Sequence, residues 1–202
     1  MARPRTHDEQ AARQGALHAF LRGGYDGTSL ADLEAATKLD RRQLYNQHGD
    51  KRGVFLRALD DFIAAAAEQF LSKLEAPGAG LAAIRSTLNG MVKIADTEQG
   101  RMGCLVCNTS REAITREDDV VFGKVSGYFD RIESAYADSL ARAVSDGDVD
   151  LSRRARQRAA RHLLGTHVAM CVLARSGAAV EVIRDVADVA LQAITAGKAR
   201  EK

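Results

Sequence analysis

The side chains with the clearest chemical use lie in a short polar stretch between residues 40 and 51. An arginine in such a stretch can fork onto the two acceptors of guanine, and a glutamine or asparagine onto adenine. A short helix that carries these side chains fits the DNA major groove. The stretch therefore predicts base reading, and the alternative is a helical hairpin whose charged face is only solvated. The side chains expected to face outward are Arg41, Arg42, Gln43, Tyr45 and Asn46.

The cysteines are the second group with reactive chemistry. Cys104 and Cys107 are three residues apart, so on a helix they would share a face. A zinc site needs two more ligands, which His167 and Cys171, four apart on a later helix, would supply. Small buried cysteines are also ordinary core residues. We expect no metal site.

The sequence shows no nucleophile beside a base, no carboxylate pair and no glycine loop suited to phosphate. We therefore expect no catalytic residue and no cofactor, and predict that the chain is not an enzyme. A triad assembled in space stays open as an alternative, and such a helical enzyme would turn over its bound ligand.

Composition sets the broad class. The chain has 202 residues and a formal net charge of +2, which is too small to prove a nucleic-acid partner by itself. Basic residues nevertheless outnumber acidic ones by five to two between residues 38 and 52. Three cysteines without a dense framework indicate a reducing compartment. No signal peptide or membrane-spanning run is recognised, so a cytoplasmic protein without a membrane partner is expected.

Helix-start signals position the polar stretch. Ser29 and Asp32 form a capping-box pattern, as do Asp40 and Gln43, and Asp50 can cap a third helix. The order is that of a helix-turn-helix, in which the second helix enters the major groove.

The remaining chain reads as helix throughout, which predicts an all-α fold of about nine helices. The expected helices cover residues 8–22, 50–75, 81–95, 118–145, 151–175 and 180–196, with residues 97–103 as a loop. We place a DNA-binding domain at residues 1–52 and an effector-binding and dimerisation domain at residues 53–202, because the helix-turn-helix needs the start of the long helix as its floor.

The first quarter of the chain resembles the DNA-binding domain of the TetR-type transcriptional regulators. The matching segments are Gly24-Tyr25-Asp26-Gly27-Thr28-Ser29-Leu30, Leu33-Glu34-Ala35-Ala36, Leu44-Tyr45, Asp50-Lys51 and Val54-Phe55. The sequence departs from the family pattern at Lys38, where a turn glycine is usual. A positive φ at Lys38 would cost about 1 kcal/mol.

The resemblance implies a set of DNA contacts and a basic N-terminal arm. Arg3 or Arg5 in that arm would reach phosphates or the minor groove, although a disordered tail is the alternative. Residues at helix starts, such as Ser29 and Lys51, suit phosphate contact. The expected DNA-binding residues are Arg5, Thr28, Ser29, Lys38, Arg41, Arg42, Gln43, Tyr45, Asn46 and Lys51.

The resemblance also implies an apolar effector pocket with a few polar groups. The segment Gly103-Cys104-Leu105-Val106-Cys107-Asn108 is similar to one that leads a pocket-lining helix in a subset of these regulators, where the leading cysteine can sense electrophiles or oxidants. Such a role at Cys104 requires a lowered thiol pKa and access. The expected ligand-binding residues are Phe62, Met91, Cys104, Cys107, Asn108, Glu112, Phe129, His167 and Cys171.

These expectations combine into one predicted function. The chain is expected to be a homodimeric repressor that pairs its last two helices with those of a second copy. It would bind a palindromic double-stranded DNA operator and be released by a small-molecule or electrophile effector of unknown identity. The alternative is a helical ligand- or metal-binding protein without DNA function.

Overall fold

The structure, a computed structural model, describes residues 9–196 except for the side chains at positions 47 and 48. Every regular element in this part of the chain is a helix. The elements are α1 (Glu9–Gly27), α2 (Leu30–Thr37), α3 (Arg41–His48), α4 (Lys51–Ala66), the π-helical turn η1 (Ala67–Leu71), α5 (Ser72–Glu75), α6 (Leu81–Ala95), α7 (Glu98–Met102), α8 (Leu105–Thr109), α9 (Ile114–Glu117), α10 (Asp119–Ser145), α11 (Arg153–Arg175) and α12 (Val180–Thr195).

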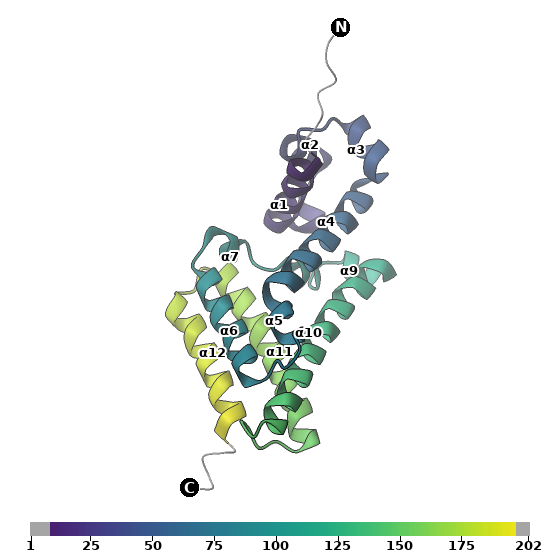
Figure 1. Cartoon of the computed structure of the whole chain (residues 1–202). Coiled ribbons are helices and arrows are strands. Elements are labelled where there is room, and N and C mark those ends of the chain that lie inside the picture. The colour runs from purple at the N-terminus through teal and green to yellow at the C-terminus, as the bar shows by residue number, and fades with distance from the viewer. Residues whose placement is uncertain (1–8, 197–202) are drawn as a thin grey trace.

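The helices form two regions joined by one rod. Figure 1 shows α1, α2 and α3 together at one end, with α4 leading from them into a bundle of longer helices. Within that bundle α10 packs on α11, α11 on α12, and α12 on α6. The predicted all-α fold with an N-terminal helix-turn-helix is confirmed.

Aromatic packing holds the N-terminal region on the start of the rod. Phe20 and Phe55 are fully buried, and their ring centroids lie 5.0 Å apart in an edge-to-face arrangement. The ring of Tyr25 lies 4.9 Å from the same Phe55 ring. Large rings dominate the burial energy of a small core. The start of α4 is therefore the floor of the helix-turn-helix, as the sequence predicts.

The predicted helix over residues 50–75 is present but contains a wide turn. Buried positions run along α4 through Ala58, Leu59 and Ala66, and then continue at Ala67 and Leu71. The step from Ala66 to Ala67 advances the buried stripe by one residue. The π-helical turn takes up that extra residue, which a regular α-helix cannot do without rotating its far end.

The connection between α6 and α10 differs from the prediction. The sequence predicts a loop over residues 97–103, and this prediction is wrong because α7 occupies residues 98–102. The Thr97 hydroxyl accepts a hydrogen bond from the Gly100 amide and so caps the helix. Two more short helices, α8 and α9, follow before α10 begins. This segment lies between the rod and the bundle and carries two of the three cysteines.

Candidate functional site: an exposed polar helix and a buried thiol cluster

Two capping boxes hold the helix-turn-helix. The Ser29 hydroxyl accepts from the Asp32 amide at 3.1 Å, and the Asp32 carboxylate accepts from the Ser29 amide at 2.8 Å. Asp40 and Gln43 make the same reciprocal pair at 2.8 and 2.9 Å. Both boxes are predicted by the sequence and are confirmed. They satisfy the first amides of α2 and α3, and so define where each helix begins.

The turn between the two helices has the backbone conformation that is costly for a lysine. Lys38 has φ of 59°, in the left-handed region, and its amide closes the end of α2 on the Glu34 carbonyl at 3.0 Å. Among the described residues it is the only non-glycine with positive φ. Glycine adopts this conformation at little cost, whereas Lys38 adopts it with strain.

The outward face of α3 is polar and accessible. Arg41, Arg42 and Asn46 are exposed, and 44% of the Tyr45 surface is accessible. The Arg41 guanidinium donates to the Glu34 carboxylate at 3.3 Å, so base reading by Arg41 would require it to turn away from α2. Leu44, on the opposite face, is buried, as predicted.

The other predicted DNA contacts fall into three groups. Arg5 lies outside the described residues. Thr28 is buried, and its hydroxyl donates to the Gly24 carbonyl at 2.6 Å, so it supports the turn into α2 rather than facing outward. Lys51 lies at the start of α4 with its Nζ 4.5 Å from the centroid of the Tyr25 ring. A cation at that position remains available for phosphate contact while packing on the aromatic face.

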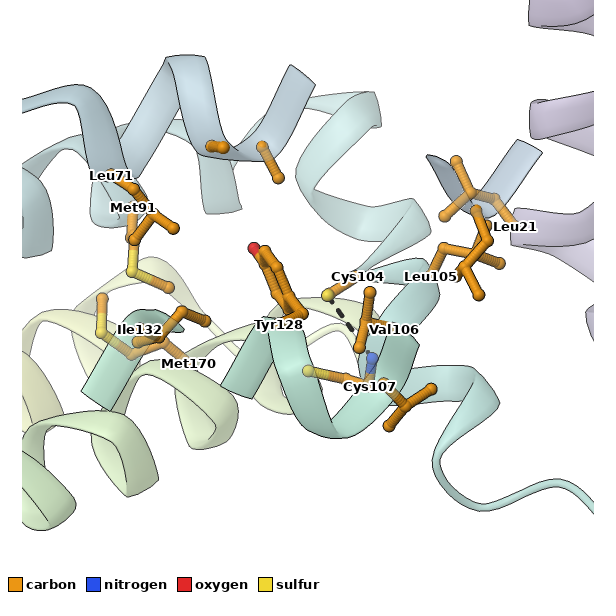
Figure 2. Close-up of a cluster of buried hydrophobic side chains, with 14 of the residues drawn as sticks. Leu21, Leu71, Met91, Cys104, Leu105, Val106, Cys107, Tyr128, Ile132 and Met170 are labelled. Carbon is orange, nitrogen blue, oxygen red and sulfur yellow. Dashed lines mark hydrogen bonds between the residues drawn. The ribbon is translucent and has the colours of Figure 1, made fainter. Parts of the chain in front are cut away.

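The three cysteines of the chain meet in the second region. The sulfur atoms of Cys104, Cys107 and Cys171 all lie within 4.8 Å of one another, with Cys104 and Cys107 buried and Cys171 partly buried. The Cys107 amide donates to the Cys104 sulfur at 3.5 Å, drawn as the dashed line in Figure 2. Of the two distant residues considered from the sequence, Cys171 joins the cluster of sulfurs, while His167 lies outside that triangle.

Hydrogen bonding inside the cluster shifts the pKa values of the three thiols in different directions. Donation from Cys107 and Cys171 lowers the pKa of the Cys104 thiol well below its ordinary value. The same bonds to Cys104, together with burial, raise the pKa of Cys107 and of Cys171. The cluster therefore holds its first negative charge on Cys104 and resists a second. The pKa of Cys104 is lowered as sensing requires, but the thiol is buried, so the access that sensing also requires is absent and the sensor role stays a prediction.

The remaining residues of the expected pocket are packed into the hydrophobic core. Met91 and His167 are buried, Phe62 and Phe129 are partly buried against the core, and the amide nitrogen of Asn108 is buried without a partner among the described residues. Burial lowers the pKa of His167 to about 4, so the imidazole is neutral at physiological pH. Their role in ligand binding stays a prediction.

Glu112 has a different environment, which local sequence patterns did not indicate. Its carboxylate accepts from the Tyr25 amide at 2.6 Å and from the Asp26 amide at 3.3 Å. Gly24, with φ of 69°, leaves room for it, because a Cβ there would lie 2.9 Å from a Glu112 oxygen. Glu112 therefore ties the end of α1 to the segment that follows the thiol cluster.

Two arginines make further ties between the regions. Arg175, in the last turn of α11, donates to the carbonyls of Leu21 and Met102, the former at 2.8 Å. Arg52 forms a forked pair with Asp118, which caps α10 and whose pKa falls to about 2 because of that pair. These contacts join residues far apart in sequence, and no local spacing signals them.

An exposed polar helix after a tight turn, joined by a rod to a helical bundle, is the architecture of the TetR-family transcriptional regulators. A cysteine mutant of the TetR-family regulator CifR, solved with double-strand operator DNA, superimposes with a TM-score of 0.83 at 25% identity, covering 95% of this chain and 99% of that one.

The sequence comparisons agree with this fold. No family model matches the chain. The uncharacterized HTH-type transcriptional regulator YezE of Bacillus subtilis is 28% identical over 199 residues, which span 96% of this chain and all of YezE. The HTH-type transcriptional repressor ComR of Escherichia coli is 39% identical over 74 residues, which span 37% of this chain and 33% of ComR. These relatives are regulators rather than enzymes, in agreement with the prediction from the sequence.

Within the described residues, the structure contains no helix that is long and apolar enough to cross a membrane.

Proposed function

We propose that the chain is a homodimeric, cytoplasmic repressor that binds a palindromic operator and releases it when an effector acts in the helical bundle. The observation that carries the proposal is the exposed polar face of α3, fixed by two capping boxes, on a chain that superimposes on an operator-bound regulator. In this proposal residues 1–52 bind DNA and residues 53–202 bind the effector and the second subunit.

In the proposed complex, α3 enters the major groove. The exposed side chains of Arg42, Tyr45 and Asn46 would face base edges, and Arg41 would join them after leaving Glu34. Lys51, beside the start of α4, would contact phosphate, which positions the helix without reading sequence.

The dimer would form through the outward faces of α11 and α12. Val172 on α11 and Val182 and Val189 on α12 are about half exposed or more. Gly165 on α11 is also exposed, and a Cβ added there would meet no atom within 4 Å, so a second helix could approach closely. Two such helices from each subunit make a four-helix interface with twofold symmetry.

The effector would act through the segment that starts at α8. This short helix packs on both α1 and α4, and Glu112 beyond it holds the amides of Tyr25 and Asp26. A change at the thiol cluster, by a small molecule or by an electrophile at Cys104, would move α8 and with it the end of α1. A coupling of about 1–3 kcal/mol corresponds to a 5- to 150-fold loss of operator affinity.

The test is operator binding by fluorescence anisotropy, with DNA from the region upstream of the gene. Arg42→Ala should weaken binding by about 1–3 kcal/mol if Arg42 reads a base. Arg85→Ala is the matched control, because it removes the same charge from an exposed site on α6. A protein that stays monomeric, or that ignores every upstream fragment at low ionic strength, would contradict the proposal and favour a ligand-binding protein without DNA function.

A further inference from the structure

All three cysteines of the chain converge on one point from two separate elements. Cys104 precedes α8 and Cys107 lies in its first turn, whereas Cys171 lies on α11. Figure 2 shows Cys104 and Cys107 beside Tyr128, with Met91 and Met170 on the far side of that ring. The cluster is built from tertiary packing, since Cys171 is distant in sequence from the other two.

The size of the sulfur triangle suits a single ion. A metal at the centre of three sulfurs, each about 2.3 Å away, requires the sulfurs to be about 4.0 Å apart. The three sulfurs here lie within 4.8 Å of one another. Each pair would therefore close by about 0.8 Å at most, the difference between those two distances, and rotation of the cysteine side chains covers such a shift.

The donor set selects the class of ion. Thiolate sulfur prefers soft ions such as Cu(I) and Zn(II) over hard ions such as Mg²⁺. The neutral imidazole of His167, one helical turn before Cys171, has a buried Nδ1 without a partner among the described residues. Tyr136 and Phe70 pack against that ring with centroid distances of 6.5 and 6.0 Å. An ion that needs a fourth ligand would have to draw this nitrogen in, because His167 lies outside the sulfur triangle.

We infer that Cys104, Cys107 and Cys171 form a binding site for one soft, thiophilic cation per subunit. This departs from the expectation, based on the sequence, that no metal is bound. Binding forms three metal–sulfur bonds. Each metal–sulfur bond replaces an S–H bond whose proton is released to solvent, with no change of oxidation state. Affinity should therefore rise with pH.

The site has a structural path to α3, and this part of the inference rests on the proposed function. Drawing Cys171 toward Cys104 pulls α11 against α8, which packs on α1 and α4. Arg175 lies one turn beyond Cys171 and donates to the carbonyl of Leu21 in α1. An ion in the cluster would thus act on the DNA-binding region through both α8 and α11.

The test titrates Cd²⁺ as the probe into the full chain, without oxygen and in a non-thiol reductant. The expected result is one equivalent per subunit, a sulfur-to-metal charge-transfer band, and loss of all three thiols to a thiol reagent. Cys171→Ser should reduce that band by about a third and weaken binding at least about tenfold. Zn²⁺ and Cu(I), each added alone, should displace Cd²⁺, and the concentrations needed show which of the two ions the site prefers. Mg²⁺ should not compete.

Controls keep folding and binding apart. Met170→Leu removes a buried sulfur next to Cys171 and should bind Cd²⁺ like the unaltered chain. Circular dichroism checks that each variant is helical. Binding that survives in the triple Cys104→Ser, Cys107→Ser, Cys171→Ser variant, or a band unchanged by Cys171→Ser, overturns the site. Normal Cd²⁺ binding with no DNA binding at all overturns the proposed function and leaves the site intact.

Discussion

Lys38 holds the turn between α2 and α3 in a backbone conformation that ordinarily belongs to glycine. Its φ of 59° brings the Cβ against the following carbonyl, an energetic cost that glycine does not have. The chain accepts this cost at the turn that sets the angle between α2 and α3, the helix proposed to read DNA. A lysine there also adds a positive charge beside the proposed DNA surface.

Replacing Lys38 should separate the strain from the charge. Lys38→Gly is expected to raise the free energy of unfolding by about 1 kcal/mol, because the left-handed conformation costs glycine little. Urea denaturation followed by circular dichroism measures it. Lys38→Ala is the control: it removes the charge but keeps the Cβ, so its stability should stay near that of the unaltered chain. Equal stabilisation by both variants would show that strain is not the cause.

His167 makes stability depend on acidity. Burial lowers its pKa to about 4 in the folded chain, against about 6.5 when unfolded. Below about pH 6.5 the imidazole of His167 is protonated in the unfolded chain. In the folded chain it stays neutral until the pH falls to about 4. Stability from this group is complete above pH 6.5 and is lost as the pH falls through that window, by about 3 kcal/mol in all.

His167→Gln should reduce the loss of stability at acid pH. The measurement is the free energy of unfolding between pH 4 and pH 7, and the variant should lose less stability across it than the unaltered chain. His162→Gln, on the exposed side of the same helix, should lose as much stability between pH 7 and pH 4 as the unaltered chain. If the two variants behave alike, the buried imidazole does not govern the acid response.

At the scale of elements, the short helix α8 occupies the decisive place. It begins at the thiol cluster, packs on α1 and α4, and is followed by Glu112, whose carboxylate is held against the amides that end α1. Burial raises the pKa of Glu112, and the two amide donors oppose that rise. A hydrogen bond to a charged group contributes about 1.5–3 kcal/mol. The bonds of Glu112 therefore help to hold the end of α1 against the helical bundle.

Glu112→Ala should loosen this tie without disturbing the helix-turn-helix itself. Amide hydrogen exchange at Tyr25 and Asp26 is expected to become about tenfold faster or more, since each amide loses its acceptor. Mass spectrometry or NMR reads the exchange. Glu117→Ala removes an exposed carboxylate on α9 and should leave both amides as they were. Unchanged exchange in Glu112→Ala would mean that the tie does not hold α1.

The sequence predicted elements best where local chemistry decides them. The caps at Ser29 and Asp40 depend on residues three apart, and α6, α10, α11 and α12 follow their apolar spacing to within a few residues. The errors and omissions are nonlocal or subtle. The cap that Thr97 gives α7 is missed, and no local pattern indicates that Glu112 reaches a backbone far away in sequence, while its place in a pocket stays a prediction. Convergence of Cys171 on Cys104 was one of several arrangements that spacing allowed.

At the scale of the whole molecule, the outward faces of α11 and α12 carry exposed valines among charged side chains. Val189 is 61% exposed and Val182 is 47% exposed, on the same side of α12 two turns apart. Exposed valines of this kind, together with the exposed small residue Gly165 on α11, are typical of a surface that another helix covers.

Val189→Glu should prevent the proposed dimer. A buried carboxylate facing its symmetry mate across a twofold axis lacks a partner, so the assembly should dissociate and operator affinity should fall with it. Analytical ultracentrifugation gives the mass. Phe122→Glu, which adds the same charge at a similarly exposed position on α10, should leave the dimer intact. A dimer that persists in Val189→Glu would place the subunit contact elsewhere.

The wide turn at Ala67–Leu71 also sets how the long rod tolerates a change of length. Removing one residue from a regular α-helix swings everything beyond it by about 100°, which would carry buried side chains to the outside. The wide turn already holds a spare residue, so loss of the exposed Gln69 would let it tighten to an ordinary spiral with both ends still facing inward. Deleting Gln69 should therefore cost little melting temperature, while deleting the exposed Arg57 from the same rod should unfold the chain. The extra residue therefore absorbs a change in the length of the rod, and it lies where the rod enters the bundle rather than at the start of α4.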